Sequence, residues 1–467
     1  FARNKNRMME RENIAVGLDI GTTKIVAMIG KKNEYGKLEI LGVGKAKSLG
    51  VHKGIVNNIS QTISSIKAAV AEAQSSAGVP IHKVTVGIAG KHIRSLQHSD
   101  YIMREKPDRF ITDDDIEALK DQVKKLVMLP GEEIIHVLPQ EYKVDSEGEI
   151  QEPVGMHGKR LEANFHVVVG QMGSIRNIAR CVREAGLEME ALTLEPLASS
   201  EAVLTKEEKE AGVAIVDIGG GTTDIAIFKD NIIRHTCVIP YGGGIITEDI
   251  KEGCSIIEKH AEQLKVKFGS AVPELEKDST FVTIPGLHGR PDKEISLKTL
   301  AQIVNARVEE ILEMVNTELK AYGAFEQKKK LIAGIVLTGG GSNLKHLRQL
   351  ANYTTGFDSR IGFANEYVAN DKNQYLKGPE FATSIGLLME SLKIRDKKPV
   401  AIEEEEIEMK AEEKLAPAEK DMMGDETQTV VQLPTQEPQV VQKTGSSKPT
   451  FGQSLMEKVK KFFEEVE

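Results

Sequence analysis

Apolar residues along this chain alternate between the two-residue repeat of strands and the longer repeat of helices. Residues 14–30 form two apolar stretches around a Gly-Thr-Thr break, which predicts a strand, a turn and a second strand. A further strand is expected over 38–47 and a helix over 59–77, where apolar residues recur at helical spacing. Residues 213–228 resemble the opening strand-turn-strand, so the pattern indicates an α/β chain in which one unit occurs twice.

The rest of the core follows the same alternation. Short strands are expected over 84–89 and 332–337. Helices are expected over 258–268, 297–322 and 381–393. The strand at 332–337 leads directly into Thr-Gly-Gly-Gly and another helix, a third strand-glycine-helix junction.

An inserted stretch, 92–165, interrupts the first unit. It contains a helix that begins after Thr112 with three aspartates in its first turn, and strand-like segments such as 136–144. Residues 167–170 are expected to return to a core strand, and 175–185 to form a helix. We therefore expect a subdomain between the two halves of the first lobe.

Composition changes sharply after the last core helix. The segment from Asp396 to Thr450 has thirteen acidic and seven basic residues, so it carries most of the net charge of −9. Its richness in Glu, Gln, Pro and Lys predicts a disordered linker. The near-neutral remainder has no basic excess, so we expect no nucleic-acid partner.

These changes predict the following order of parts: an N-terminal extension (1–13), a first lobe (14–91 and 166–212) with its insertion (92–165), a second lobe (213–393) with an insertion around 230–298, a linker (394–452) and a terminal helix (453–467). Because Met8 and Met9 follow Phe1 so closely, the first few residues are not expected to be a natural N-terminus.

Three cysteines, Cys181, Cys237 and Cys254, have neither CxxC nor Cys/His spacing. They are expected to be reduced, as in a cytoplasmic protein, and not to hold a metal. The sequence shows no signal peptide and no apolar run long enough to span a bilayer.

The first chemical motif is Gly-Leu-Asp-Ile-Gly-Thr-Thr-Lys, residues 17–24. A strand delivers Asp19 at its end, Gly21 admits an anion close to the backbone, and Thr22, Thr23 and Lys24 offer donors and positive charge. Asp19 can hold Mg²⁺ through water, because Mg²⁺ keeps much of its hydration. A plain Gly-Thr hairpin is the alternative for this motif taken alone.

The second motif repeats this arrangement 198 positions later, with Asp217 in the place of Asp19. Its turn is expected to bind phosphate through Gly219, Gly220, Gly221, Thr222 and Thr223. Two such hairpins facing each other can hold a polyphosphate from both sides, with both aspartates directed at one magnesium ion. The duplication makes a chance hairpin a poor explanation.

The third motif, residues 337–344, places glycines between a strand and a helix. Bare backbone there lets a base or ribose lie close and exposes N–H groups to anions. Its expected ligand contacts are Gly339, Gly340, Gly341 and Asn343.

Together, the three motifs resemble the two phosphate loops and the adenosine loop of the actin, sugar kinase and heat-shock chaperone superfamily. The segments 194–198 and 382–386 resemble its two connecting helices. The resemblance covers nearly all of residues 14–393 and implies an actin-like ATPase fold with two duplicated ribonuclease-H-like lobes, ATP and Mg²⁺.

Within that superfamily the chain resembles the FtsA family of bacterial cell division proteins, through GLDIGTTK, VDIGGGTTD, the PYGGG turn, the AEQLK helix and the inserted stretch. The resemblance implies that Glu262 and Lys265 reach the ribose and base, and that the PYGGG turn contributes Gly243 and Gly244. It places Glu195 where relatives orient the hydrolytic water, with Asp19 and Asp217 as its catalytic companions. A capping or pocket-lining carboxylate is the alternative for Glu195, and at most a weak ATPase is expected.

The C-terminal segment has one continuous apolar stripe with charged residues beside it. The stripe comprises Leu455, Met456, Val459, Phe462, Phe463 and Val466, and the flanking lysines are Lys458, Lys460 and Lys461. A helix of this length suits a membrane interface, and each lysine can add roughly 1 kcal/mol near anionic lipid. The alternative is a helix that docks on its own globular domain or on a partner protein.

The resemblance therefore implies an ATP-controlled polymer on the cytoplasmic face of the cell membrane at the division septum. Its expected partners are the tubulin-like protein FtsZ, further copies of this chain, inner-membrane lipids and later division proteins. A sugar-kinase-type phosphotransferase and a PilM-like pilus assembly protein are the alternatives. The kinase leaves the terminal helix unexplained, and PilM relatives normally lack it.

Overall fold

The computed structural model describes residues 14–286, 289, 291–364, 367–369 and 374–397. The predicted N-terminal extension, nearly all of the linker and the whole terminal helix lie outside these residues. None of the helices in the described ranges combines the length and apolar character that crossing a bilayer requires.

The first lobe is built on a five-stranded sheet in the order β11-β6-β1-β2-β3. Its strands are β1 (Ala15–Ile20), β2 (Lys24–Lys32), β3 (Leu38–Lys47), β6 (Lys83–Ile88) and β11 (Glu188–Leu194), with a small hairpin of β4 (Val51–His52) and β5 (Ile55–Val56). Helix α2 (Ile59–Ala77) packs on β3, and α4 (Met172–Glu184) packs on α2. The predicted strand-turn-strand, third strand and helix are all present.

Helix α2 illustrates how local chemistry sets an element's ends. The Asn58 side chain accepts a hydrogen bond from the Gln61 amide at the N-terminus, and Gly78 takes a left-handed conformation (φ 68°) at the C-terminus. A side chain on Gly44 of β3 would lie 1.8 Å from the Ala69 carbonyl oxygen, so glycine allows the helix to approach the sheet.

The second lobe repeats the design, with a five-stranded sheet in the order β14-β13-β12-β17-β18. In both sheets a strand pairs antiparallel with the next one along the chain and parallel with a later one. The strands are β12 (Val213–Ile218), β13 (Thr223–Lys229), β14 (Ile232–Ile239), β17 (Ile335–Thr338) and β18 (Ser359–Ile361). The duplication predicted from the two motifs is therefore a duplication of sheets.

Helices and a hairpin complete the second lobe. They are α6 (Lys206–Ala211), which leads into it, and α7 (Gly243–Cys254), α8 (Glu258–Phe268), β15 (Phe281–Ile284), β16 (Lys293–Ser296), α9 (Leu297–Tyr322) and α10 (Leu347–Thr355). Strand β17 begins three residues later than predicted. Gly334 has a positive φ of 66°, and its amide bonds to Leu331 in a turn, which keeps Ile332 outside the strand.

The inserted subdomain is a four-stranded antiparallel sheet, β7-β10-β8-β9, with helix α3 (Asp113–Lys124). Its strands are β7 (Ile93–Met103), β8 (Glu132–Val144), β9 (Glu147–Ile150) and β10 (Arg160–Gln171). The prediction that 167–170 returns to a core strand was wrong. The β10 ladder with β7 and β8 runs on through Gly170, so the inserted sheet absorbs those residues.

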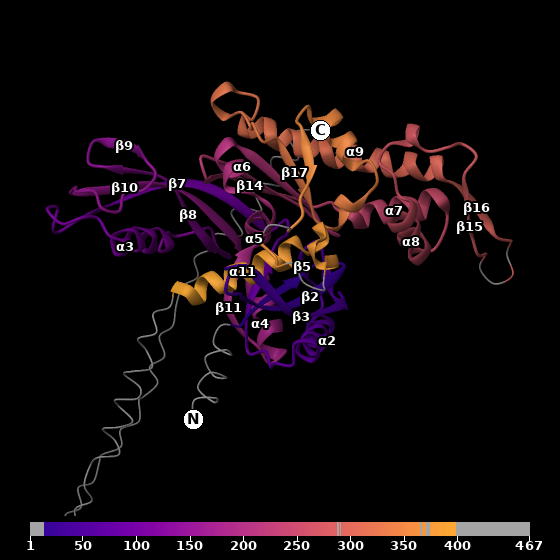
Figure 1. Cartoon of the computed structure of the whole chain (residues 1–467), viewed down its shortest axis with the longest axis horizontal. Helices are drawn as coiled ribbons and strands as arrows, with labels where there is room; N and C mark the ends of the chain where they lie inside the picture. Colours follow the sequence, from indigo (N-terminus) through magenta and orange to yellow (C-terminus); the bar gives the residue numbers. More distant parts are fainter. Residues whose placement is uncertain (1–13, 287–288, 290, 365–366, 370–373, 398–467) are drawn as a thin grey trace, which may run out of the picture. The chain divides into compact units, whose positions relative to one another are not determined.

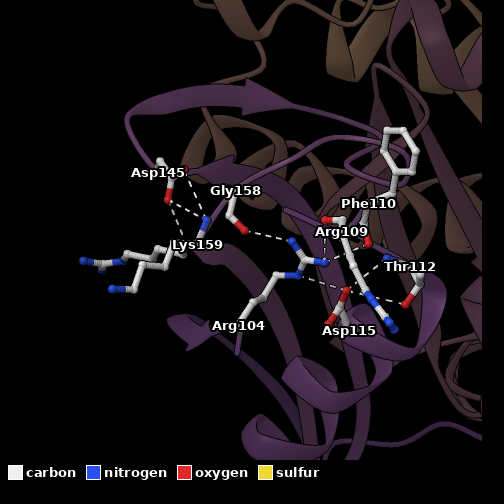
Figure 2. Close-up of polar contacts among 9 residues, drawn as sticks. Arg104, Arg109, Phe110, Thr112, Asp115, Asp145, Gly158 and Lys159 are labelled. Carbon is white, nitrogen blue, oxygen red and sulfur yellow. Dashed lines mark hydrogen bonds and ion pairs between the residues drawn. The ribbon is translucent and has the colours of Figure 1, made fainter. Parts of the chain in front are cut away.

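A buried arginine organises one end of this subdomain (Figure 2). Arg104 Nε donates to Asp115 Oδ2 at 3.1 Å, and Nη1 donates to the Gly158 carbonyl at 2.8 Å. Its Nη2 donates to the Arg109 and Phe110 carbonyls at 3.0 and 2.7 Å. One guanidinium thus joins α3, the segment before it and the segment before β10.

Two helices cross between the lobes (Figure 1). Helix α5 (Glu195–Val203) contacts β12 and β13, and α11 (Ala382–Lys397) contacts β1 and β2. At their crossing, a side chain on Gly386 would lie 1.8 Å from the Ala198 carbonyl oxygen. The two expected connecting helices are therefore present, in contact with each other and with both sheets.

Candidate nucleotide-binding site

Two strand-to-strand turns, one from each lobe, face each other across a cleft. The first joins β1 to β2 and the second joins β12 to β13. A side chain on Gly221 would lie 2.5 Å from Thr22 Oγ1, and one on Gly220 would lie 2.4 Å from Thr23 Cγ2. The turns touch because the second consists of glycines, so the two predicted phosphate loops lie together.

The third glycine motif closes the cleft beside the second turn. Gly339 follows β17 with a φ of 81°, and a side chain there would lie 2.3 Å from Asp217 Oδ1. Gly340 lines the cleft, whereas Gly341 packs against Ile218. Asn343 Nδ2 donates to Glu380 Oε2 at 3.1 Å, which ties this motif to the approach to α11.

The crossing helices hold both aspartates through hydroxyl groups. Asp19 Oδ2 accepts a hydrogen bond from Ser384 Oγ at 3.0 Å. Asp217 Oδ2 accepts one from Ser199 Oγ at 2.6 Å and another from Thr383 Oγ1 at 3.0 Å. Sequence reasoning did not predict these three hydroxyl residues, because their only signal is their place on helices that had to be folded against the motifs first.

Acidic residues that line the cleft include Asp19, Glu195, Asp217 and Asp224. Burial raises the pKa of Asp19 to about 6 and that of Asp224 to about 8, with Asp217 adding to both shifts. The pKa of Glu195 lies well above its usual value because of burial and then of Asp19, Asp224 and Asp217. Burial also raises the pKa of Asp217, although its two hydroxyl donors oppose that shift. The cleft therefore favours positive charge.

Among the described residues that line the cleft, Lys24 is the only lysine. Burial lowers its pKa, and the charge of Asp19 opposes that effect. Its Nζ donates to the Glu380 carbonyl at 2.5 Å and lies 4.5 Å from the centre of the Phe381 ring. These contacts hold the side chain in the wall of the cleft.

This donor set fits a magnesium-polyphosphate group. Asp217 and Asp224 are direct partners in the β12–β13 register, and Asp224 Oδ1 is buried without a hydrogen-bond partner. With both carboxylates ionised this pair would destabilise the sheet unless a cation offset the charge, and burial together with the charge of Asp217 accordingly raises the pKa of Asp224 to about 8. Within the described ranges, no three His, Cys, Asp or Glu side chains converge well enough to hold a metal ion directly. The donors that the cleft offers are carboxylates such as Asp19 and Asp217, which suit a cation that keeps part of its water.

The remaining predicted residues support the second turn instead of lining the cleft. The Gly243 and Gly244 amides donate to the Gly219 and Gly220 carbonyls at 2.8 and 2.7 Å. Lys265 Nζ in turn donates to the Gly243 carbonyl at 2.8 Å.

Further contacts extend this support. Lys265 Nζ also donates to Glu262 Oε2 at 2.7 Å, which keeps that pair beside α7. Thr223 Oγ1 donates to the Tyr241 carbonyl at 2.8 Å. Contact of Glu262 and Lys265 with ribose or base stays a prediction.

The cleft brings together most of the predicted site and adds residues that the motifs did not single out. Predicted residues in its lining are Asp19, Gly21, Thr22, Thr23, Lys24, Glu195, Asp217, Gly219, Gly220, Gly221, Thr222, Gly339 and Gly340. Added residues include Gly54, Ala89, Asp224, Glu380 and Thr383. Asp224 belongs to the second motif. Its signal in the sequence was an acidic residue at the start of an otherwise apolar strand.

Comparison with known proteins decides the family. Residues 214–386 match the model of "Cell division protein FtsA", and residues 90–169 match that of "SHS2 domain inserted in FTSA". The chain is 41% identical to Cell division protein FtsA of Pseudomonas aeruginosa over 81% of this chain and 89% of that protein. It is 37% identical to the Neisseria meningitidis protein of the same name, over 84% and 93%.

The chain belongs to the FtsA family. It is an actin-like cell division protein, as the motif resemblance implied. A solved PilM-PilN type IV pilus biogenesis complex has a similar fold, with a TM-score of 0.59 and 17% identity over 81% of this chain and 98% of that chain. The family match locates the inserted subdomain at 90–169, close to the sheet formed by β7 to β10.

Proposed function

We propose that this FtsA-family protein binds ATP and Mg²⁺ between its lobes and tethers an FtsZ polymer to the cytoplasmic membrane. The observation that carries the nucleotide part is the contact of two duplicated turns over a cleft lined by acidic residues, Asp19 and Asp217 among them. The membrane part rests on the apolar stripe near the C-terminus, which lies outside the described residues.

The roles within the cleft follow from charge and position. Lys24 and the amides of the two turns would bind phosphate oxygens, and Asp19 and Asp217 would hold magnesium through its water. The glycines after β17 would lie against adenosine. Bound nucleotide would contact both lobes, so it would favour their closure and control polymerisation.

Hydrolysis would be slow and would depend on positioning. Glu195, the first residue of α5, lines the cleft beside Asp19 and Asp224 and would orient the attacking water. The alternative for Glu195 is a capping carboxylate at the start of its helix, where negative charge is favourable.

The proposed partners match the family and the chain's layout. FtsZ would bind the second lobe, where residues 230–298 are the segment in which to look for the contact, and the inserted subdomain would contact neighbouring copies and later division proteins. The terminal helix would lie on anionic lipid at the division septum. One such helix binds weakly, so polymerisation would supply firm attachment by linking many copies.

Vesicle pelleting tests the tether. The full chain should sediment with vesicles containing anionic phospholipid, and FtsZ should sediment only when the chain is present. The double variant Phe462→Asp/Phe463→Asp should remain in the supernatant while still binding MgATP. Phe451→Asp, the same change just before the predicted helix, should pellet like the wild type.

Two results would decide against the proposal. If the double variant still pellets, the terminal helix is not the anchor. Phosphate transfer from ATP to an added sugar would instead support the sugar-kinase alternative.

A further inference from the structure

A histidine of the inserted subdomain contacts the backbone next to Glu195. The Leu194 amide donates to His136 Nε2 at 3.0 Å. A backbone N–H can only donate, so Nε2 must be unprotonated and Nδ1 must carry the proton. Burial lowers the pKa of His136 to about 4, which keeps the ring neutral as this bond requires.

Leu194 is a sensitive point in the fold. It ends β11, with Ile88 as its register partner, and it is the N-cap residue of α5 in an extended conformation (φ −61°, ψ 126°). Glu195 follows immediately and lines the cleft. A shift of the Leu194 amide therefore moves the Glu195 main chain directly, with no flexible side chain between them to absorb it.

Contacts between the inserted sheet and the second lobe hold the strand of His136 in place. On the same strand, Gln140 Nε2 donates to the Ile233 carbonyl at 2.8 Å, and Arg234 Nη1 donates to Glu141 Oε1 at 2.7 Å. His166 Nε2, on the neighbouring β10, lies 2.9 Å from Thr236 Oγ1. Strand β8 thus contacts β14 of the second lobe and, through His136, the residue that precedes α5 at the edge of the first lobe.

We propose that His136 is a positioning residue for nucleotide hydrolysis, acting through the Leu194 amide on Glu195. This inference rests on the ATP function proposed above. It gives the inserted subdomain an effect on the nucleotide site: a partner that shifts the inserted sheet moves His136, and so changes the hydrolysis rate more than the nucleotide affinity.

The test measures MgATP affinity and the single-turnover hydrolysis rate separately, with the full chain in excess over ATP. His136→Phe keeps a ring but removes the acceptor, whereas His136→Gln offers the Leu194 amide a new one. His136→Phe should lower the rate by about tenfold or more and leave the dissociation constant within about twofold. His136→Gln should recover most of the rate.

Two controls complete the design. His98→Phe, on β7 of the same sheet, should change neither quantity, because His98 is paired with Asp100 and not with α5. The double variant His136→Phe/Glu195→Gln should hydrolyse ATP no more slowly than Glu195→Gln alone, because both changes act on the same carboxylate.

The outcomes separate this inference from the function beneath it. A wild-type chain that binds no MgATP overturns the proposed function. Binding with equal rates for wild type and His136→Phe overturns the role of His136 alone, as does a loss that His136→Gln fails to restore. If the wild type hydrolyses ATP no faster than Glu195→Gln, then Glu195 has no part in hydrolysis. That result overturns this inference but leaves the proposal of MgATP binding standing.

Discussion

The crossing of α5 and α11 supports the candidate nucleotide cleft, and one added methyl group should disrupt that crossing. A Cβ on Gly386 would lie 1.8 Å from the Ala198 oxygen and 2.2 Å from the Ala198 carbonyl carbon. Both are backbone atoms, so no rotamer change relieves the clash and the helices must separate by more than 1 Å to restore a normal contact of roughly 3 Å or more. Overpacking of this kind costs about 3 kcal/mol, and the gain in helix propensity returns about 1 kcal/mol.

Gly386→Ala should therefore lower the free energy of unfolding by about 2 kcal/mol. It should also weaken MgATP binding, because Thr383 and Ser384 on the same helix hold Asp217 and Asp19. Urea denaturation of the full chain, followed by calorimetric titration with MgATP, measures both effects.

A matched control exists in helix α4. A Cβ on Gly173 would meet no other part of the described structure within 4 Å, so Gly173→Ala should raise the free energy of unfolding by up to about 1 kcal/mol. The same substitution thus has opposite signs at two helical sites. Equal stabilities for the two variants would refute the close crossing.

Other predictions concern the inserted subdomain. Burial, and secondarily His235, lower the pKa of His166 from 6.5 to about 4, so the unfolded chain binds the extra proton first as pH falls. The contribution of neutral His166 to the free energy of unfolding is therefore complete above about pH 6.5. It should fall by about 2 kcal/mol between pH 7 and pH 5. Urea midpoints of His166→Gln should lose less over that range, and equal losses would contradict the assignment. Arg104→Met removes the guanidinium donor from three carbonyl groups and from Asp115, which keeps only the Thr112 donors, and should cost about 3 kcal/mol. Exposed Arg109→Met should cost less than about 0.5 kcal/mol in the same assay, and similar losses for both would count against the buried network.

Sequence periodicity predicted long helices well and strand membership less well. Helices α2, α8 and α9 begin and end where their apolar repeats and turn residues predicted, because caps such as Asn58 and Gly323 act locally. Strand β10 was divided wrongly, since the length of a strand depends on neighbours that the sequence does not place beside it. Strand pairing is a tertiary property.

The site shows the same division. Asp19 and Asp217 were predicted because a repeated motif identifies them without any knowledge of the fold. Ser199 and Ser384 were not, because each reaches its aspartate only after α5 and α11 cross. The alignment of His136 with the amide before Glu195 likewise depends on how the inserted sheet packs on the first lobe.

Calorimetric titration of the full chain with ATP, in the presence and absence of Mg²⁺, tests the nucleotide cleft most directly. The wild type should bind one MgATP per chain. Asp217→Ala should weaken MgATP binding by about tenfold or more, because it removes a carboxylate that would hold the magnesium ion. Two hydroxyl groups fix that carboxylate in position in the wild type. Asp278→Ala, at an exposed position of the second lobe, should bind like the wild type. No binding by the wild type, or equal affinity for Asp217→Ala, would contradict the assignment of this cleft as the nucleotide site.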